Sequence, residues 1–508
     1  GIVETLTVGL GGSTYRDVVA YGAMVLILVF RPYGLFGEED DLVIRPAVEQ
    51  GRDQGWEIDG PLPADATYFK AYDGKYDGVV AMYHDQGHAP MKLVAFDFDG
   101  TRLIPVALSA DEIEKYYEGF SNDTIWPLYH DVIAAPRYRR VWWDAYVRVN
   151  RRFAEAAADA VAEGGTVWVQ DYQLQLVPKM LREMRPDLTI GYFHHIPFPA
   201  YGLYSQLPWR RLVLEGLLGA DVIGFQRVAD AGNFARAVRR LFRYETRAGR
   251  ITVPGDDGTA HIALAKAFPI SIAAETYIDL AKKPEVQARA REIREGLGNP
   301  KAILLGVDRL DYTKGIRHRL KAFGELLEDG RVAVDDVTLV QVASPSRERV
   351  EAYVQLRDEI ELTVARINGD HDTFGHSAIR YLHQGYPREE MVALFLAADV
   401  MLVTALRDGM NLVAKEYVAT RADNRGVLVL SEFAGAADEL GSALKVNPHD
   451  IDTLKDTIIQ AIEMPAAEQA RRMRSMRKRV IEHDVKAWSD SFLSALDEAR
   501  TAKENRTR

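Results

Sequence analysis

Two basic side chains follow an apolar stretch in the segment LGVDRLDYTKGI, residues 305–316. Arg309 and Lys314 lie just beyond the run AILLGV, which has the composition of a buried strand. Because charge-assisted hydrogen bonds contribute about 1.5–3 kcal/mol each, two such cations would bind a diphosphate firmly. The residues alone equally allow a surface ion pair with Asp308 or Asp311.

A second apolar run, VMLVT, leads into ALRDGMNLVAKEYVATR. Backbone amides near Gly409, Met410 and Asn411 precede an amphipathic helix, where they can bind an oxyanion or sugar hydroxyls. Asp408 and Glu416 are eight residues apart, so their carboxylates would contact different parts of one ligand, such as the hexose and the ribose of a nucleotide sugar. For Asp408 the alternative role is a simple helix N-cap.

Polar residues follow two further strand-like runs. Asp171 comes after TVWVQ, and His195 comes after TIGYFH and before the rigid IPFP turn. Each of these residues alone could be structural. Since α/β sheets bind ligands at the carboxyl ends of their strands, polar residues at four strand ends indicate one shared site.

The strands that would position these residues recur from about residue 103 to 496, as TVWVQ, TIGYF, DVIGF, AILLGV, VTLVQVA, VMLVT and GVLVL. Amphipathic helical stretches separate them. This alternation predicts parallel sheets covered by helices on both faces. The break between two sheets is predicted near residues 267–277, where Pro269 interrupts a strand-like segment.

Composition limits the possible classes of protein. A chain of 508 residues, 47% hydrophobic and 27% charged, can bury at least two cores. The absence of cysteine excludes disulfides, thiolate metal sites and cysteine nucleophiles, and fits a reducing, cytoplasmic location. A net charge of -11 argues against nucleic-acid binding. The one basic stretch, residues 471–484, is interpreted as a solvated helix face opposite Met473, Met476 and Val480.

The first hundred residues have a different character. The uncharged run at 18–30 has 13 residues, fewer than the roughly 20 of a membrane helix, so we expect a buried strand or helix rather than a clipped membrane segment. Residues 1–40 resemble the C-terminus of branched-chain amino-acid transporter permeases, and GLGGS at 9–13 is a weak candidate phosphate loop.

Two further segments of this region suggest other chemistry. Residues 41–95, with YDGVVAMYHDQGHAPMK, resemble 4-hydroxythreonine-4-phosphate dehydrogenases, in which the residue matching His84 binds a metal. One ligand cannot build a metal site, so none is expected. Asp97 and Asp99 in FDFDGT resemble the nucleophile loop of haloacid-dehalogenase-type phosphatases, which predicts magnesium-dependent phosphate release as a competing activity.

The longest resemblance begins near residue 103. The chain contains, in this order, YYEGFSNDTIWPLYH, VWVQDYQLQLVP, HHIPFP, LPWR, ADVIGFQ, GVDRLDYTKGI, VQVASPSRERV, RINGDH and LFLAADVMLVTALRDGMNLVAKEY. These motifs and their order resemble those of trehalose-6-phosphate synthases. The resemblance implies an α/β fold of the GT-B type, two Rossmann-like domains facing a cleft. It also implies transfer of glucose from UDP-glucose to glucose 6-phosphate with retention, without metal or other cofactor.

The resemblance implies a role for each matched residue on the donor side. Arg309 and Lys314 would hold the donor diphosphate, and Glu416 its ribose. Asp408 would grip the transferred glucose together with the backbone amides of Gly409, Met410, Asn411 and Leu412.

On the acceptor side, Tyr117, Trp126 and Asp171 would shape the pocket, and His195 would contact the transferred glucose near its 6-hydroxyl. His195, Arg309, Lys314 and Asp408 are the catalytic candidates.

The chain departs from the family in its acceptor half. Residues 1–100 contain neither the NRLP-like strand end nor the paired-glycine loop of the family. Gln170 and Gly202 stand where the family usually has histidine and glutamate. Alternatives are therefore a related transferase with another phosphorylated acceptor, such as glycerol 3-phosphate, and a nucleotide-sugar-binding protein with impaired catalysis.

We expect small-molecule partners, a nucleotide sugar and a sugar phosphate, with no membrane or nucleic-acid contact and a possible homo-oligomer. The expected regions are an atypical, mosaic-like N-terminal region at 1–100, an incomplete acceptor domain at 101–267, a nucleotide-sugar-binding domain at 268–485, and a C-terminal helix and polar tail at 486–508.

Overall fold

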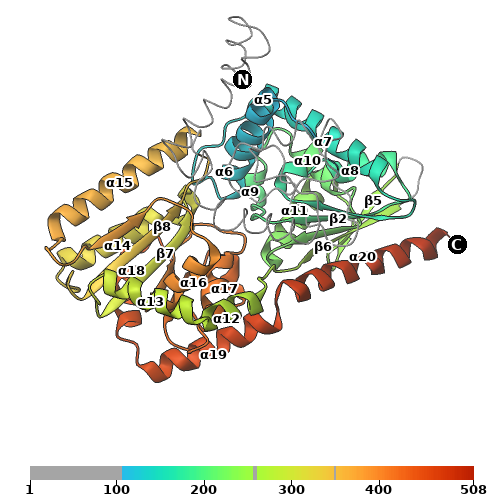
Figure 1. Ribbon diagram of the computed structural model, residues 1–508. Coiled ribbons are helices and arrows are strands. Elements are labelled where there is room, and N and C mark those ends of the chain that lie inside the picture. The colour runs from blue at the N-terminus through green and yellow to red at the C-terminus, as the bar shows by residue number, and fades with distance from the viewer. Residues whose placement is uncertain (1–103, 105, 256–259, 348–349, 508) are drawn as a thin grey trace, which may run out of the picture. The chain divides into compact units, whose positions relative to one another are not determined.

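Two six-stranded sheets, each with its own helices, form the core of the protein (Figure 1). The structure, a computed structural model, describes residues 104, 106–255, 260–347 and 350–507. The predictions for GLGGS, for the run at 18–30, for His84, for Asp97 and Asp99, and the two N-terminal resemblances lie outside the described residues. We call the parts built on the two sheets the first and second lobes.

The first sheet combines parallel and antiparallel pairing, in the order β1-β2-β3-β6-β5-β4. Its strands are β1 (Thr166–Gln170), β2 (Thr189–His194), β3 (Val222–Phe225), β4 (Thr246–Arg247), β5 (Arg250–Pro254) and β6 (Ala260–Ala267). The expectation of a purely parallel sheet is wrong here, because β5 pairs antiparallel with both β4 and β6. Ala248 and Gly249, at φ 48° and 78°, form the two-residue turn between β4 and β5. Two positive φ values in succession are typical of the turn that closes a tight hairpin.

Helices of the first lobe pack through aromatic side chains. They are α5 (Ala110–Glu112), the π-helical η2 (Ile113–Ile125), α6 (Trp126–Tyr129), α7 (Arg140–Ala160), η3 (Tyr172–Leu174), α8 (Val177–Met184), α9 (Tyr201–Tyr204), α10 (Arg210–Leu217) and α11 (Val228–Phe242). Trp143 of α7 stacks on Trp209 with ring centres 5.1 Å apart, and Phe120 of η2 lies 4.4 Å from Tyr146. These contacts fix η2 and α6, which carry Tyr117 and Trp126, against the lobe.

The second sheet is parallel throughout, in the order β12-β11-β10-β7-β8-β9. Its strands are β7 (Ala302–Arg309), β8 (Val337–Ser344), β9 (Ile379–Leu382), β10 (Val400–Val403), β11 (Val427–Ser431) and β12 (Leu444–Val446). Strand order reverses between β7 and β10, and such a switch point is where α/β sheets bind ligands. Arg309 ends β7, and Asp408 lies five residues beyond β10.

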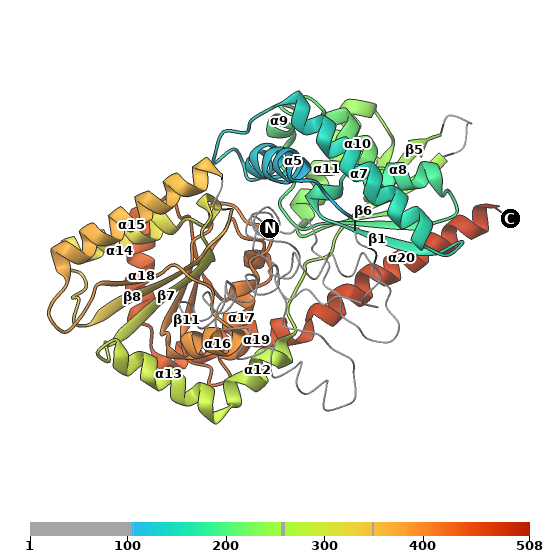
Figure 2. The ribbon, with the colours of Figure 1, turned by 45° about the horizontal axis from the view of Figure 1, so that its top comes forward.

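Helices cover both faces of the second sheet, as expected for buried parallel strands (Figure 2). One face carries α14 (Ile316–Glu328), α15 (Glu351–His371) and α18 (Ile451–Ile462). The other carries α12 (Ala274–Lys282), α13 (Pro284–Gly296), α16 (Arg388–Ala397), α17 (Leu412–Thr420) and α19 (Ala466–Glu482), and two short 3-10 turns are η4 (Tyr312–Lys314) and η5 (Gly435–Asp438).

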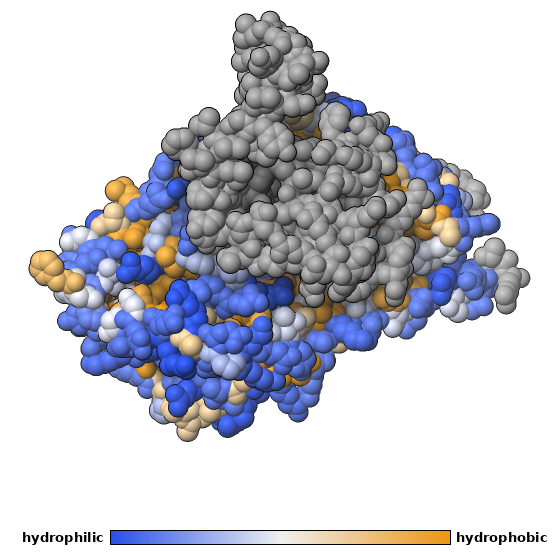
Figure 3. Space-filling view, in the orientation of Figure 1, coloured by the Kyte–Doolittle hydropathy of each residue, from blue (hydrophilic) through white to orange (hydrophobic). Residues whose placement is uncertain are grey.

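Helix α19 contains the basic stretch, and its interpretation as a solvated face is confirmed. Met473, Met476 and Val480 are buried, whereas Arg471, Arg474 and Lys478 are exposed. The surface of the second lobe seen in Figure 3 is largely hydrophilic, with small apolar patches between the charged groups. In the described part of the chain, no helix has both the length and the apolar character needed to cross a membrane.

The C-terminal helix α20 (Val485–Thr507) leaves the second lobe and packs on β2 and β3 of the first. Phe492 is fully buried there and stacks on Trp168 of β1 at 4.6 Å. Gly191 and Gly224 make room for it, because a Cβ atom at either glycine would lie 2.8 Å from the Phe492 ring. The helix continues to Thr507, through residues for which the sequence predicts a polar tail.

Candidate active site

Arg309 and Lys314 are presented by the turn that follows β7. Asp311 accepts a hydrogen bond from the Thr313 amide at 2.9 Å and so caps η4, which ends at Lys314. Gly315 comes next at φ 66°, and a Cβ atom there would lie 2.0 Å from the Thr404 carbonyl oxygen. Only glycine fits this approach between the loops that follow β7 and β10.

Lys314 and Asp408 form an ion pair between these two loops. The Lys314 ammonium lies 2.6 Å from Asp408 Oδ2, and each side chain is 13% exposed. Burial raises the pKa of Asp408. The charge of Lys314 and hydrogen bonds from Lys314 and Asn411 lower it by a larger amount, so the net pKa lies below its ordinary value. Asp408 is therefore a carboxylate near neutral pH.

The surface ion pairs that the sequence allowed are resolved differently. Asp308 pairs with Arg319 at 2.9 Å, and both side chains are buried. Asp311 pairs with Arg347 at 3.2 Å. Lys314 is thus directed to Asp408 rather than to its neighbours in the sequence.

The segment from Asp408 to Leu412 forms a loop attached to η5, which we call the catalytic loop because the sequence predicts a catalytic role for Asp408. The Gly435 amide donates to the Asp408 carbonyl at 3.2 Å, and the Ala436 amide donates to the Met410 carbonyl at 2.7 Å. The N-cap role considered for Asp408 is wrong, because Asn411 caps α17 by accepting from the Ala414 amide at 3.1 Å. The Asp408 carboxylate is thereby available for another purpose.

Glu416 lies on α17 near two residues that the sequence did not single out. Tyr277 of α12 lies beside Glu416, and the guanidinium carbon of Arg388 lies 5.8 Å from the centre of the Tyr277 ring. Burial raises the pKa of Glu416, while the Tyr277 hydrogen bond and Arg388 lower it by less. The carboxylate is thus largely buried beside a tyrosine and an arginine.

His195 and Asp171 come from neighbouring parallel strands of the first lobe. The His195 amide donates to Asp171 Oδ1 at 3.1 Å, and His195 Nε2 lies 2.8 Å from Gln170 Oε1. Gln170, a departure from the family, therefore orients the His195 ring. The His195 carbonyl also abuts the catalytic loop, since a Cβ atom at Gly409 would lie 2.3 Å from its oxygen.

Trp126 joins the acceptor candidates to the cations of the second lobe. The guanidinium carbons of Arg347 and Arg309 lie 3.8 Å and 5.8 Å from its ring centre. Tyr117, half-buried on η2, lies near Arg347. The structure thus brings Tyr117, Trp126 and Arg309 around one further residue, Arg347.

Arg347 is a functional candidate that the sequence reasoning missed. It pairs with buried Asp311, and its Nη2 donates to the Tyr172 hydroxyl at 3.4 Å. Burial raises the pKa of Asp311, but Arg347, Lys314 and Arg309 lower it to about 2. A signal was present, because Arg347 follows the strand run VTLVQVA as Arg309 follows AILLGV.

His130 is a second missed residue at the site. Its Nδ1 lies 2.8 Å from the Trp126 carbonyl oxygen, and its ring centre lies 4.1 Å from that of Trp126. Burial lowers the pKa of His130 to about 4, so the ring is neutral near pH 7. A neutral histidine in this place fixes Trp126 without adding charge.

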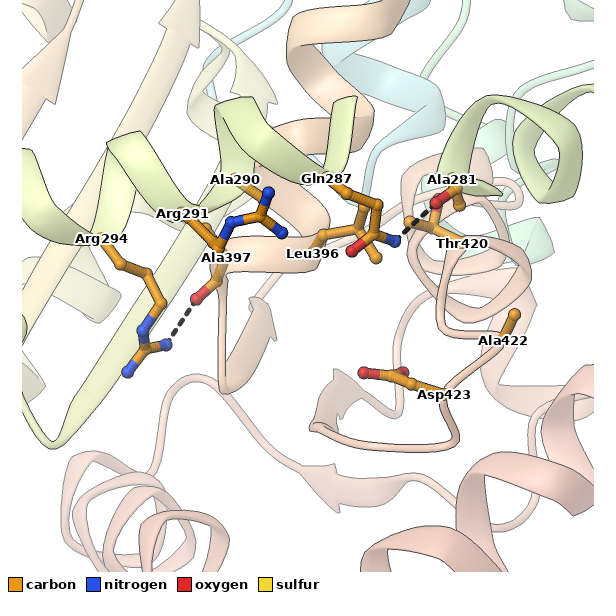
Figure 4. Close-up of a pocket in the computed structure, with 10 residues that line it drawn as sticks. All are labelled: Ala281, Gln287, Ala290, Arg291, Arg294, Leu396, Ala397, Thr420, Ala422 and Asp423. Atoms are coloured by element: carbon orange, nitrogen blue, oxygen red, sulfur yellow. Dashed lines mark hydrogen bonds between the residues drawn. The ribbon is translucent and has the colours of Figure 1, made fainter. Parts of the chain in front are cut away.

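A cavity of about 180 Å³ lies elsewhere, near the amino ends of β7 and β10 (Figure 4). The polar side chains that line it stabilise the fold through hydrogen bonds to backbone carbonyls. Arg294 donates to the Ala397 carbonyl at 2.7 Å, and Gln287 donates to the Ala281 carbonyl at 2.6 Å. It contains none of the predicted site residues, so it is not the candidate site.

Two Rossmann-like lobes, with cations at the strand ends of the second, have the architecture of a GT-B glycosyltransferase. A sequence model of glycosyltransferase family 20 matches residues 59–498. The chain belongs to glycosyltransferase family 20. The predicted family and fold class are confirmed.

Relatives and solved structures agree with this assignment. The trehalose-6-phosphate synthase of Mycobacterium avium is 58% identical over 405 residues, which are 79% of this chain and 82% of that protein. An α,α-trehalose-phosphate synthase (UDP-forming) from Burkholderia xenovorans, in complex with glucose-6-phosphate, has a TM-score of 0.73 and 37% identity over 77% of this chain and 86% of its own. An Escherichia coli structure with UDP-2-fluoro glucose bound has a TM-score of 0.72 and 36% identity over 77% and 85%.

Proposed function

We propose that this site transfers glucose from UDP-glucose to glucose 6-phosphate, giving α,α-trehalose 6-phosphate and UDP with retention at the anomeric carbon. The observation that carries the proposal is the Lys314–Asp408 pair beside Arg309, at the switch point of the second sheet. The cation proposed to bind the diphosphate and the carboxylate proposed to bind the hexose are then joined directly by one hydrogen bond.

The donor side works by charge complementarity. As the bond from the anomeric carbon to UDP breaks, negative charge grows on the leaving phosphate. Arg309 and Lys314 stabilise that charge more in the transition state than in the ground state, which is what accelerates the step. Asp408 and the catalytic-loop amides bind the glucose hydroxyls, His195 contacts the glucose from the first lobe, and Glu416 binds the ribose.

The acceptor side uses the cluster around Trp126. Arg347 binds the phosphate of glucose 6-phosphate, because its guanidinium is fixed over Trp126 and beside Tyr117. Tyr117, Trp126 and Asp171 shape the pocket. The acceptor hydroxyl then attacks from the face that UDP leaves, its proton passes to the departing phosphate oxygen, and one carbon–oxygen bond replaces the other.

The first test measures UDP release from UDP-glucose with and without glucose 6-phosphate, with the product mass read in the same sample. We expect acceptor-dependent release and the mass of a phosphorylated disaccharide. In Arg309→Ala, release should fall by about 10²–10³ because one transition-state donor is lost. UDP binding without release would contradict the proposal and favour a nucleotide-sugar-binding protein.

Metal independence is a second expected result. Arg309 and Lys314 supply the positive charge at the diphosphate that a metal ion could otherwise bring. We therefore expect kcat to change less than twofold when the protein is dialysed against EDTA and assayed without divalent cations. A loss restored by magnesium would overturn this part of the proposal.

A cytoplasmic location and a homo-oligomer are further parts of the proposal. The lack of cysteine supports the former. Light scattering at several protein concentrations would measure the latter.

A further inference from the structure

Arg407, the residue immediately before Asp408, lies between two carboxylates of the first lobe. Its Nη2 is 3.4 Å from Oδ1 of Asp230 on α11, and its Nε is 3.3 Å from Oδ2 of Asp131, which follows α6. The Asp230 side chain is fully buried, and that of Arg407 is 15% exposed. An arginine of the second lobe is thus inserted between two acidic groups of the first.

A second ion pair holds the other side of the catalytic loop. Arg227, at the start of α11, makes two hydrogen bonds to the Asp438 carboxylate, at 2.7 Å and 2.8 Å. Asp438 ends η5, whose Gly435 amide donates to the Asp408 carbonyl. Helix α11 therefore contacts the catalytic loop through Arg407 on one side and through η5 on the other.

We propose that Arg407 is a positioning residue, which holds the catalytic loop in register with the first lobe so that Asp408 and His195 face the same glucose. The proposal rests on the function proposed for that loop. A guanidinium presents its donors in a fixed fork and can bind two carboxylates at once, which the single ammonium of lysine does less well. Arg407 would then act through Asp408 and does not itself touch substrate.

The arrangement also predicts a pH dependence. Charged groups facing Asp230 are Arg407 from the second lobe, Arg227 from its own helix and Asp131 from the segment after α6. Burial raises the pKa of Asp230 to about 6, while Arg407, Arg227 and the Phe198 amide lower it and Asp131 raises it. As pH falls through about 6, Asp230 takes up a proton, becomes neutral and is no longer attracted to Arg407 by its charge. Activity should therefore decline on the acid side.

The test compares Arg407→Gln, Arg407→Lys and Asp230→Asn with a matched control. Arg137→Gln removes another ion pair between the lobes, Arg137–Glu351 at 3.0 Å, which does not contact the catalytic loop. For Arg407→Gln we expect kcat to fall about 10²-fold, as for a small misplacement of a reacting group. Arg407→Lys should recover part of that loss, and Arg137→Gln should stay within twofold of wild type. Asp230→Asn should be slow at all pH values and lack the acid limb near pH 6.

Calorimetric binding separates this proposal from the proposed function. Arg407→Gln should bind UDP as wild type does, because Arg309 and Lys314 remain, but should bind UDP-glucose about tenfold more weakly. If wild type shows no transfer while this selective loss persists, the proposed function fails and the positioning role stands. Wild-type kcat and UDP-glucose affinity in Arg407→Gln, or an equal loss in Arg137→Gln, would overturn the positioning role.

Discussion

Lys314→Met is expected to reduce kcat/KM for UDP-glucose by at least about 10³. Loss of one donor to a developing oxyanion costs on the order of 10²–10³ in rate. Lys314 has a second role, because its ammonium neutralises Asp408 at 2.6 Å and both side chains are largely buried. Removing it leaves a buried carboxylate unpaired, which typically costs about 3–5 kcal/mol. Steady-state kinetics and thermal unfolding would measure the two losses separately.

The pH dependence distinguishes the loss of the pair from a general folding defect. In wild type the net pKa of Asp408 is lowered, so Asp408 stabilises the fold above its ordinary pKa and this contribution is lost as pH falls. Without Lys314, only the Asn411 hydrogen bond and His130 oppose the effect of burial, so that pKa rises. The deficit in unfolding free energy should therefore be larger at neutral pH than in acid. Lys321→Met, on the following helix α14 with a 64% exposed side chain, is the control and should resemble wild type. A pH-independent deficit would count against the buried pair.

Gly409→Ala is expected to reduce kcat about 10²-fold although it adds one methyl group. The new Cβ would lie 2.3 Å from the His195 carbonyl oxygen and 3.2 Å from Ile196 backbone atoms, so backbone of one lobe must move away from the other. A displacement of about 1 Å at reacting groups can cost about 10²-fold in rate, and overpacking costs about 1–3 kcal/mol of stability. Single-turnover kinetics would show the loss in the chemical step.

The control for this substitution is a second glycine-to-alanine change, which lies within a helix. At Gly232 of α11 nothing lies within 4 Å of the added Cβ atom. Alanine there should be neutral or stabilise by up to about 1 kcal/mol. Equal kcat values for Gly409→Ala and Gly232→Ala would mean that the two lobes do not need this close approach.

Several features of the second lobe were predictable from the sequence. The strands β7, β8, β10 and β11 are almost wholly buried, so each appears in the sequence as a continuous apolar run, and Arg309, Lys314 and Asp408 lie at or within five residues of the end of such a run. This is why Arg309, Lys314 and Asp408 could be proposed together. The roles assigned to them stay predictions.

Other features depend on contacts that a linear pattern does not contain. Lys314 and Asp408 are 94 positions apart, so their pairing could not be distinguished from a local one with Asp308 or Asp311. N-cap preference does not separate Asp408 from Asn411, because both residue types cap helices well. The hydrogen bond from the Ala414 amide to the Asn411 side chain decides between them, and the linear pattern does not contain it.

The acceptor half was harder to predict for a related reason. Its strands β4 and β5 are short and polar, so they lack the apolar run that marks the others. The docking of α20 depends on Gly191 and Gly224, whose lack of side chains makes room for Phe492, which lies 301 and 268 positions further along the chain. Glycine in a strand shows that space is needed, but it does not show what fills it.

The return of α20 to the first lobe makes the second lobe an insertion within the first. The chain passes between the lobes twice, after β6 and before α20, and the two passages are joined by a hydrogen bond from the Val485 amide to the Ile272 carbonyl at 3.0 Å. A single connecting segment would let the lobes rotate freely about it. Two connecting segments that are hydrogen-bonded to each other prevent that rotation and act as a hinge. The lobes then open and close about one axis. Cleavage of either connecting segment would leave the lobes joined by the other segment and would restore the rotation between them.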